Sequence, residues 1–270
     1  MSPFRTVSAW LTLTLALAAM SAPALRAQDR KPPLLRALLV CGGCCHDYDR
    51  QKTILRNGLE SRAWVVVDTI QQGGTARESR IPLYEDPNWA KGYDVVLHDD
   101  CFGMVGDTNF IAKILAPHRA GVPAVNLHCA AHSYRVATDL EWPRFLGIRS
   151  LQHGPASPID VRTVDATHPI TAGLSWNTWL TGKEELYNNI TIHPTAQPLQ
   201  RGRQGTNELV LTWVNHYGKT RVFNTTLGHF NETVSDPRYL DLVTRGLLWA
   251  CDRLDDAHRR PFRPDADAAE

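Results

Sequence analysis

The sequence predicts an α/β domain whose N-terminal half is a doubly wound, mainly parallel sheet and whose C-terminal half is rich in β-strands. In the N-terminal half, apolar segments of strand length alternate with helix-like segments, which is the order typical of a doubly wound sheet. From residue 159 onward, strand-like segments follow one another instead. The chain beyond the N-terminal segment holds about 240 residues, which fits one such domain better than two.

The first predicted strand is the clearest element of the sheet. Residues 34–41 (LLRALLVC) form a continuous apolar run that ends at Gly42 and Gly43, as expected of a strand buried on both faces. Further strands are predicted at residues 64–69, 93–98 and 122–127. The accompanying helices are predicted at residues 49–62 and 107–119, and a long polar loop at residues 71–90.

The second half of the chain predicts strands at residues 159–164, 209–216 and 221–227. The last two are expected to form a hairpin around Gly218, which supplies the turn. A closing helix is predicted at residues 237–251, because its leucines and valine recur on one apolar face.

The two ends of the chain are predicted to lie outside the folded domain. Residues 1–27 combine Arg5, an apolar stretch too short to span a bilayer, and small-residue cleavage sites after Ala24 and, more weakly, after Ala27. Together these features predict a cleaved signal peptide and an exported, periplasmic or extracellular protein. The domain is then expected at residues 34–252. The charged residues 253–270 predict a flexible tail.

The charge balance excludes some partners. The chain carries 29 basic and 28 acidic residues, for a net charge of +1, and has no basic stripe. Nucleic acid is therefore not an expected partner. After signal cleavage no segment is left that would span a membrane, and the oligomeric state is open.

Several histidines follow predicted strands. In a doubly wound sheet, ligands bind outside the carboxyl ends of the strands. The residues predicted at those ends are His46, Asp47, Asp100, His128, His132 and His229. We therefore expect the four histidines to converge in one cleft, although histidines in a core often serve packing alone.

A series of short motifs resembles one known family. These motifs are Gly42-Gly43 with His46-Asp47, the segment 121–130, the segment 168–174, Glu184-Glu185-Leu186-Tyr187, and the segment 221–229. In order and spacing they resemble the ThuA-like (trehalose utilisation) family, whose fold is similar to that of class I glutamine amidotransferases and therefore flavodoxin-like. The resemblance implies a role in carbohydrate catabolism, with a small saccharide such as a disaccharide or keto-sugar as the substrate.

Cys129 stands at the strand-to-helix elbow where amidotransferases carry their nucleophile. Those enzymes follow the late histidine with a glutamate two residues on, because the base needs an orienting carboxylate. Here Asn231 occupies that position, and His128 and Ala131 replace the usual elbow glycines. We therefore predict that Cys129 is not an essential nucleophile and that the protein is not a glutamine amidotransferase.

Histidines and carboxylates are the residues best suited to proton transfer at neutral pH. The predicted catalytic residues are His229, His128, Glu185 and Asp47. The predicted substrate-binding residues are His46, His132, Asp100, Glu184 and Tyr187. Which glutamate of the Glu184-Glu185 pair matters is open, since at least one is expected to be merely solvated.

A metal site is a possible addition to this chemistry. His128 and His132 are four residues apart, so a helical turn would place both on one face. His46, His229 or Asp47 could complete a site for a zinc-like divalent metal, with His46 the preferred third ligand. The alternative is that two polar residues simply begin a helix, and no cofactor is then required.

The six cysteines lie at positions 41, 44, 45, 101, 129 and 251. A flavodoxin-like order makes the first and third strands neighbours, which brings Cys101 close to the loop after the first strand. Export then predicts a disulfide from Cys101 to Cys44 or Cys45. The alternative is a group of three thiols that bind a soft metal, with Cys251 a buried free thiol in either case.

Two functions follow from these observations. The first is a saccharide-processing hydrolase, lyase or isomerase that acts by general acid/base catalysis, with or without a metal. The second is a non-catalytic carbohydrate-binding or scaffold domain on the same fold, because a fold alone does not fix a function.

Overall fold

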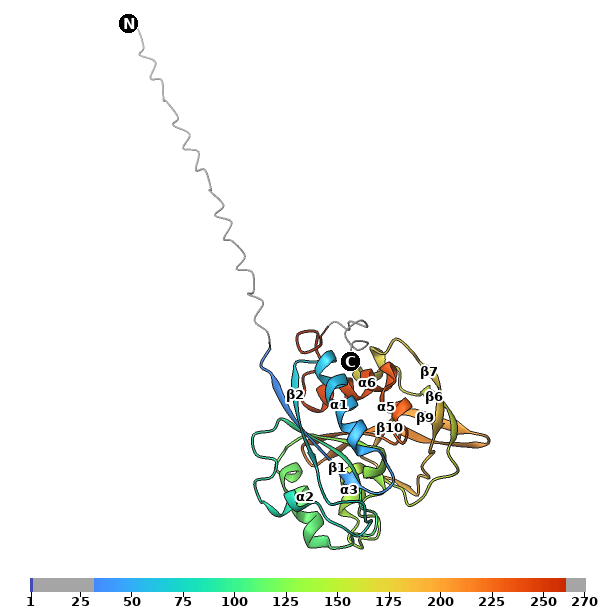
Figure 1. Cartoon of the computed structure of the whole chain (residues 1–270). Coiled ribbons are helices and arrows are strands. Elements are labelled where there is room, and N and C mark those ends of the chain that lie inside the picture. Colours follow the sequence, from blue (N-terminus) through green and yellow to red (C-terminus); the bar gives the residue numbers. More distant parts are fainter. Residues whose placement is uncertain (2–31, 261–270) are drawn as a thin grey trace. The chain divides into compact units, whose positions relative to one another are not determined.

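The computed structural model describes residues 32–260, together with Met1. The predicted signal peptide therefore lies outside the described residues, apart from its first residue. One mixed sheet of nine strands runs through the domain in the order β2-β1-β3-β4-β11-β10-β9-β6-β7 (Figure 1). Two short strands of two residues each, β5 (Ile148–Arg149) and β8 (Thr191–Ile192), pair with each other in a separate sheet.

The first five strands of this order are parallel. They are β2 (Val65–Gln71), β1 (Leu35–Gly43), β3 (Val95–Cys101), β4 (Ala124–Leu127) and β11 (Thr220–Thr225). All residues of β1 except Arg36 are buried, as the continuous apolar run predicted. The predicted flavodoxin-like core, with the first strand between the second and third, is confirmed.

Helices cover both faces of the parallel half. On one face α1 (Tyr48–Arg62) packs with α6 (Pro237–Ala250), and on the other α2 (Thr108–Arg119) packs with α3 (Glu141–Leu146) (Figure 1). Each helix pair closes its own hydrophobic core against the sheet. The short helices are η1 (Pro82–Glu85), η2 (His128–Ala131), α4 (Pro169–Ala172) and α5 (Asn231–Val234).

The remaining four strands are antiparallel to their neighbours. They are β10 (Asn207–Tyr217), β9 (Gln197–Gln204), β6 (Ser157–Thr163) and β7 (Thr178–Glu184). The hairpin of β10 and β11 around Gly218 is confirmed. The sequence did not predict β9, because its segment QPLQRGRQ is mostly polar. It is held in the sheet by strands on both sides, and Gly202 lets Ile159 pack so closely that a Cβ would lie 2.7 Å from its Cγ2.

Two local expectations are wrong. Residues 71–90 are not entirely loop, since η1 forms within them and buries Tyr84. The start of the predicted flexible tail is docked: Trp64 N donates to His258 O at 2.9 Å, and Ala63 forms a β-bridge with Arg259. Residues 261–270 lie outside the described part. No helix within residues 32–260 is long and apolar enough to cross a membrane.

Candidate active site

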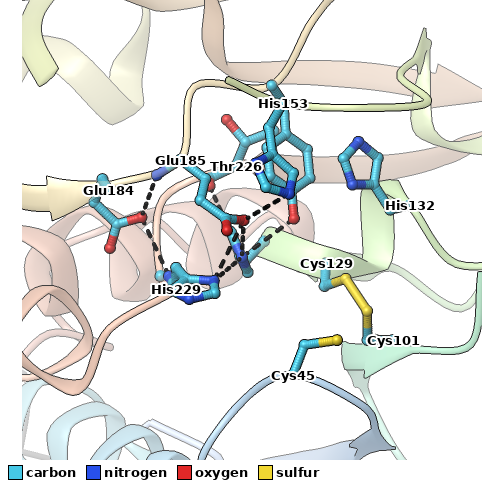
Figure 2. Close-up of polar contacts among 12 residues, drawn as sticks. Cys45, Cys101, Cys129, His132, His153, Glu184, Glu185, Thr226 and His229 are labelled. Atoms are coloured by element: carbon cyan, nitrogen blue, oxygen red, sulfur yellow. Dashed lines mark hydrogen bonds and ion pairs between the residues drawn. A yellow bond between two sulfur atoms is a disulfide. The ribbon is translucent and has the colours of Figure 1, made fainter. Parts of the chain in front are cut away.

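A cavity of about 290 Å³ lies at the carboxyl ends of β1 and β3, the edge of the sheet where ligands bind in this class of fold. A larger cavity, of about 550 Å³, lies elsewhere and includes no histidine or cysteine in its lining. The side chains that gather around the smaller cavity are shown in Figure 2. Its lining includes Cys44, Cys45, His46, Cys101, Cys129, His132, Arg135, His153, Glu185, Tyr187 and His229.

Three imidazoles from three segments meet beside this cavity. His46 follows β1, His128 begins η2 after β4, and His229 follows β11. The ring centroid of His46 lies 4.7 Å from that of His128 and 4.8 Å from that of His229, and the latter two are 5.3 Å apart. We call these three residues the histidine cluster.

Hydrogen bonds fix the orientation of His128. Its Nδ1 lies 2.7 Å from the carbonyl oxygen of Thr226. Because a carbonyl can only accept, Nδ1 carries a proton, and the Nε2 of the neutral ring is an acceptor. That Nε2 lies 3.2 Å from the Tyr187 hydroxyl and 3.3 Å from His229 Nδ1.

Glu185 supplies the negative charge of the site. Its Oε2 lies 3.3 Å from His229 Nδ1, 3.4 Å from His153 Nε2 and 3.6 Å from His128 Nε2 (Figure 2). Burial would raise the pKa of Glu185, but the adjacent imidazoles of His128 and His229 outweigh it and hold that pKa well below the usual range. The carboxylate is therefore ionised at neutral pH.

The surroundings of His229 and His46 shift the pKa values of the two imidazoles in opposite directions. Burial lowers the pKa of His229, but the hydrogen bond and charge of Glu185 outweigh it and raise the pKa above the ordinary value. Burial, with the neighbouring His128 and His229, lowers the pKa of His46 to about 2. The site thus combines an imidazole that favours the charged form with one that stays neutral.

The histidine cluster also has the composition of a zinc site. One ring nitrogen from each of its members lies within 4.8 Å of the others. Both ring nitrogens of His46 are buried without a hydrogen-bond partner among the described side chains and backbone. Three neutral imidazoles with an open fourth position are a ligand set that Zn²⁺ accepts in catalytic sites.

Of the predicted metal ligands, His132 lies outside the histidine cluster, because it is engaged elsewhere. Its Nε2 lies 2.8 Å from Ser150 Oγ, and its ring stacks on Tyr187 with centroids 3.7 Å apart. His132 does line the cavity. The imidazole that joins His46 and His128 is instead that of His229, which the chain brings back to the same edge about a hundred residues later.

Two predicted carboxylates do not reach the cavity. Asp47 is exposed, caps α1 through Arg50 N and accepts a hydrogen bond from Asn231 Nδ2 at 2.8 Å. Asp100 is buried and accepts from Ser133 Oγ and Tyr134 OH. Neither lines this cavity, although Asp47 lines a neighbouring one together with His46. The catalytic role of Asp47 and the substrate-binding role of Asp100 therefore remain predictions.

The adjacent glutamates Glu184 and Glu185 have separate tasks. Glu184 is fully buried and accepts from the backbone N–H groups of His229 at 3.2 Å and Phe230 at 3.4 Å. It therefore orients the segment that carries His229 (Figure 2), whereas Glu185 faces the cavity. Neither is the solvated carboxylate expected for one member of the pair.

Comparison with known proteins identifies the family. The ThuA family, described as trehalose utilisation, matches residues 37–250. The chain belongs to the ThuA family. No curated protein matches it.

Solved structures of other ThuA-like proteins have the same fold. A putative ThuA-like protein from Parabacteroides merdae superposes with a TM-score of 0.64 at 20% identity, over 80% of this chain and 90% of that one. Another, from Bacteroides uniformis, superposes with a TM-score of 0.63 at 15% identity, over 87% of this chain and 98% of that one. At these identities the likeness concerns the fold alone.

Sequence reasoning missed His153 in this ThuA chain. His153 does not follow a predicted strand, and it reaches Glu185 only because residue 153 forms an isolated antiparallel bridge with Tyr187. Arg135 was also missed; its Nη1 donates to Leu151 O at 2.7 Å, and it lines the same cavity. No local pattern signals either residue, because their positions depend on pairing between distant loops.

The disulfide prediction is wrong in its pairing. The bonds join Cys101 to Cys129 and Cys44 to Cys45, which are neighbours in the sequence. The expected proximity does occur, since Cys44 Sγ lies 3.7 Å from Cys101 Sγ. Cys251 is a free thiol, as predicted, but it is only partly buried.

The elbow residue Cys129 carries no thiol when it is bonded to Cys101. It sits in η2 directly after His128, whose φ of +40° is in the left-handed region that a non-glycine residue seldom adopts. A disulfide sulfur cannot act as the attacking nucleophile of acyl transfer. That Cys129 is not an essential nucleophile remains a prediction.

Proposed function

We propose that this ThuA protein is an exported enzyme that processes a disaccharide or keto-sugar by general acid/base catalysis. The observation that carries the proposal is the contact of Glu185 with both His229 and His128, where Glu185 and His229 line the cavity. Enzymes commonly use a pair of titratable groups with different pKa values to donate a proton to a substrate and to accept one from it. The family description, trehalose utilisation, supports a saccharide as the substrate.

His229 is the proposed general acid. Glu185 raises its pKa, so a larger share of the ring is charged near neutral pH and can donate a proton to a sugar oxygen. Glu184 holds the backbone of this residue through the N–H of His229. The donor is thus oriented by one glutamate and charged by the other.

His128 is the proposed general base. The carbonyl of Thr226 binds its Nδ1–H, so the lone pair of Nε2 is directed toward His229 and Tyr187. A base and an acid this close can remove a proton at one sugar position and protonate oxygen at a neighbouring one. This chemistry suits a lyase or an isomerase of a keto-sugar, and with water as nucleophile it also suits a hydrolase.

A divalent metal would change the roles of these residues. His46, His128 and His229 would then hold the metal, which would supply a Lewis acid at the cavity wall, and Glu185 would remain the carboxylate beside these ligands. The unpartnered nitrogens of His46 favour this metal-assisted form. Both forms use the same cavity and differ in whether the purified protein contains a stoichiometric metal.

Turnover measured on a panel of disaccharides and their keto derivatives tests the proposal. Activity that is lost in His229→Ala and retained in His216→Ala would support it, since His216 is exposed and does not line the cavity. Metal analysis of the same samples separates the two forms. Saccharide binding without turnover, unchanged in His229→Ala, would instead identify a non-catalytic binding domain.

A further inference from the structure

Four cysteines from three segments meet at one side of the cavity. Cys44 and Cys45 lie in the loop after β1, Cys101 ends β3, and Cys129 lies in η2. The sulfurs of Cys44, Cys45 and Cys101 lie within 4.8 Å of one another, and Cys101 is bonded to Cys129. Figure 2 shows Cys45 beside the Cys101–Cys129 bond. The two disulfides are thus in direct contact.

The two disulfides differ in their access to solvent. Cys45 is exposed and Cys44 is half-buried, whereas Cys101 and Cys129 are only 6% and 5% exposed. An external thiol therefore reaches the Cys44–Cys45 bond more readily than the Cys101–Cys129 bond. Thiol–disulfide exchange requires a sulfur to approach a disulfide sulfur directly, and Cys44 Sγ already lies 3.7 Å from Cys101 Sγ.

We propose that the four cysteines form a redox relay that carries two electrons from an external dithiol to the buried Cys101–Cys129 disulfide. In the first step the dithiol reduces Cys44–Cys45, is itself oxidised to a disulfide, and leaves two thiols on the protein. In the second step Cys44 sulfur attacks Cys101. The Cys101–Cys129 bond breaks, a Cys44–Cys101 bond forms, and the proton of Cys44 ends on Cys129.

The third step restores the outer disulfide. Cys45 sulfur attacks Cys44, the Cys44–Cys101 bond breaks, and the proton of Cys45 ends on Cys101. The sum of the steps is one dithiol oxidised and one buried disulfide reduced, with Cys44–Cys45 regenerated. The relay does not require the saccharide chemistry proposed above.

The relay controls the wall of the cavity next to the histidine cluster. A ring nitrogen of His46 lies within 4.8 Å of the sulfurs of Cys101 and Cys129, and His46 directly follows Cys45 in the chain. Reduction of the inner bond therefore places two thiols beside this imidazole and frees the elbow residue Cys129. The relay thereby makes the chemistry of this wall depend on the redox state of the compartment.

A trapping variant of the full chain tests the second step. Cys45→Ser lacks the resolving sulfur and leaves Cys44 without its disulfide partner. We expect its non-reducing digest to contain a Cys44–Cys101 linked peptide, with Cys129 alkylated, although no reductant was added. A folded Cys45→Ser protein, verified by circular dichroism, in which Cys101 remains bonded to Cys129 alone would overturn the proposal.

A rate measurement tests the relay as a whole. Native protein is treated with dithiothreitol, quenched by alkylation, and Cys129 labelling is followed by mass spectrometry. In the double variant Cys44→Ser/Cys45→Ser we expect labelling to slow at least about tenfold, because only the buried bond is left to attack; the control Cys251→Ser should match the parent. An unchanged rate in the double variant, or six free thiols in protein from an oxidising host, would overturn the relay.

Discussion

The two halves of the sheet contribute to the candidate site in different ways. The parallel half places residues of the histidine cluster at strand ends, as a doubly wound topology dictates. The antiparallel half contributes Glu184, the last residue of β7, and the segment directly after it, with Glu185 and Tyr187. One half supplies imidazoles at a fixed edge, and the other supplies the charge that raises the pKa of His229. The site therefore depends on the junction between the halves rather than on either alone.

The largest expected effect comes from removing that charge. Glu185→Gln should lower kcat by roughly 10²–10⁴-fold, the usual contribution of general acid/base catalysis. The alkaline limit of activity should also move to lower pH, because Glu185 is what raises the pKa of His229. The measurement is a pH–rate profile on the best saccharide found, with His216→Ala as control. A profile identical to that of the parent would show that the antiparallel half does not charge the site.

A smaller effect on activity is expected from Glu184, because it contacts His229 only through the backbone N–H of that residue. Glu184→Ala removes the acceptor of two N–H groups and should lower the free energy of unfolding by about 1–3 kcal/mol. Its activity should fall less than that of Glu185→Gln, and the alkaline limit should move less, because Glu184 raises the pKa of His229 less than Glu185 does. Glu184→Gln keeps one carbonyl oxygen and should recover part of the stability. Chemical denaturation of the parent, Glu184→Gln and Glu184→Ala should give decreasing stability in that order. Equal losses of stability in the two variants would contradict this role of Glu184.

The packing of the antiparallel half can be tested at two glycines. A Cβ on Gly202 would lie 2.7 Å from Ile159 and 3.1 Å from Leu186, the residue after Glu185. Gly202→Ala should therefore destabilise the fold by about 1–3 kcal/mol. Gly182→Ala is the matched control in β7, because a Cβ there meets nothing within 4 Å. Equal urea-unfolding midpoints for the two variants would contradict the claim that β9 needs a glycine at position 202 for close packing.

The parallel half has its own pH dependence, centred on Asp99. Burial, and then the neighbouring Asp100, raises the pKa of this carboxyl from 3.8 to about 7. Between about pH 4 and pH 7 the unfolded chain releases this proton while the folded chain keeps it. The Asp99 contribution therefore reduces stability as pH rises through this window, by at most about 1.4 kcal/mol per pH unit. The free energy of unfolding, measured by denaturant titration at several pH values, should vary less with pH in Asp99→Asn than in the parent. Parallel pH dependences for the two proteins would refute the effect.

The smallest effect is expected at Cys251, the free thiol at the C-terminal end of α6. Cys251 forms no disulfide and lies outside the cavity. Cys251→Ser should leave saccharide turnover unchanged and alter the urea midpoint only slightly, since its sulfur is only partly buried. A large loss of turnover would mean that a residue of the parallel half far from the strand ends takes part in the chemistry.

The sequence alone determined the parallel half of the molecule. A continuous apolar run such as residues 34–41 can be satisfied only by burial on both faces, and the alternation with helices then fixes the topology. The positions of His46, His128 and His229 followed, because each lies at a strand end. The family also followed from short motifs in a fixed order. Export and the catalytic roles remain predictions.

The tertiary structure decided which residues meet. Asp47 and Asp100 follow the same strands as the histidines, yet one turns outward to cap a helix and the other turns into the core. His153 reaches Glu185 through a bridge between loops, and Cys101 bonds to Cys129 rather than to the loop after β1. The physical reason is that local pattern specifies which face of an element is buried. The direction of a loop and the choice among nearby sulfurs depend on contacts between segments far apart in the chain.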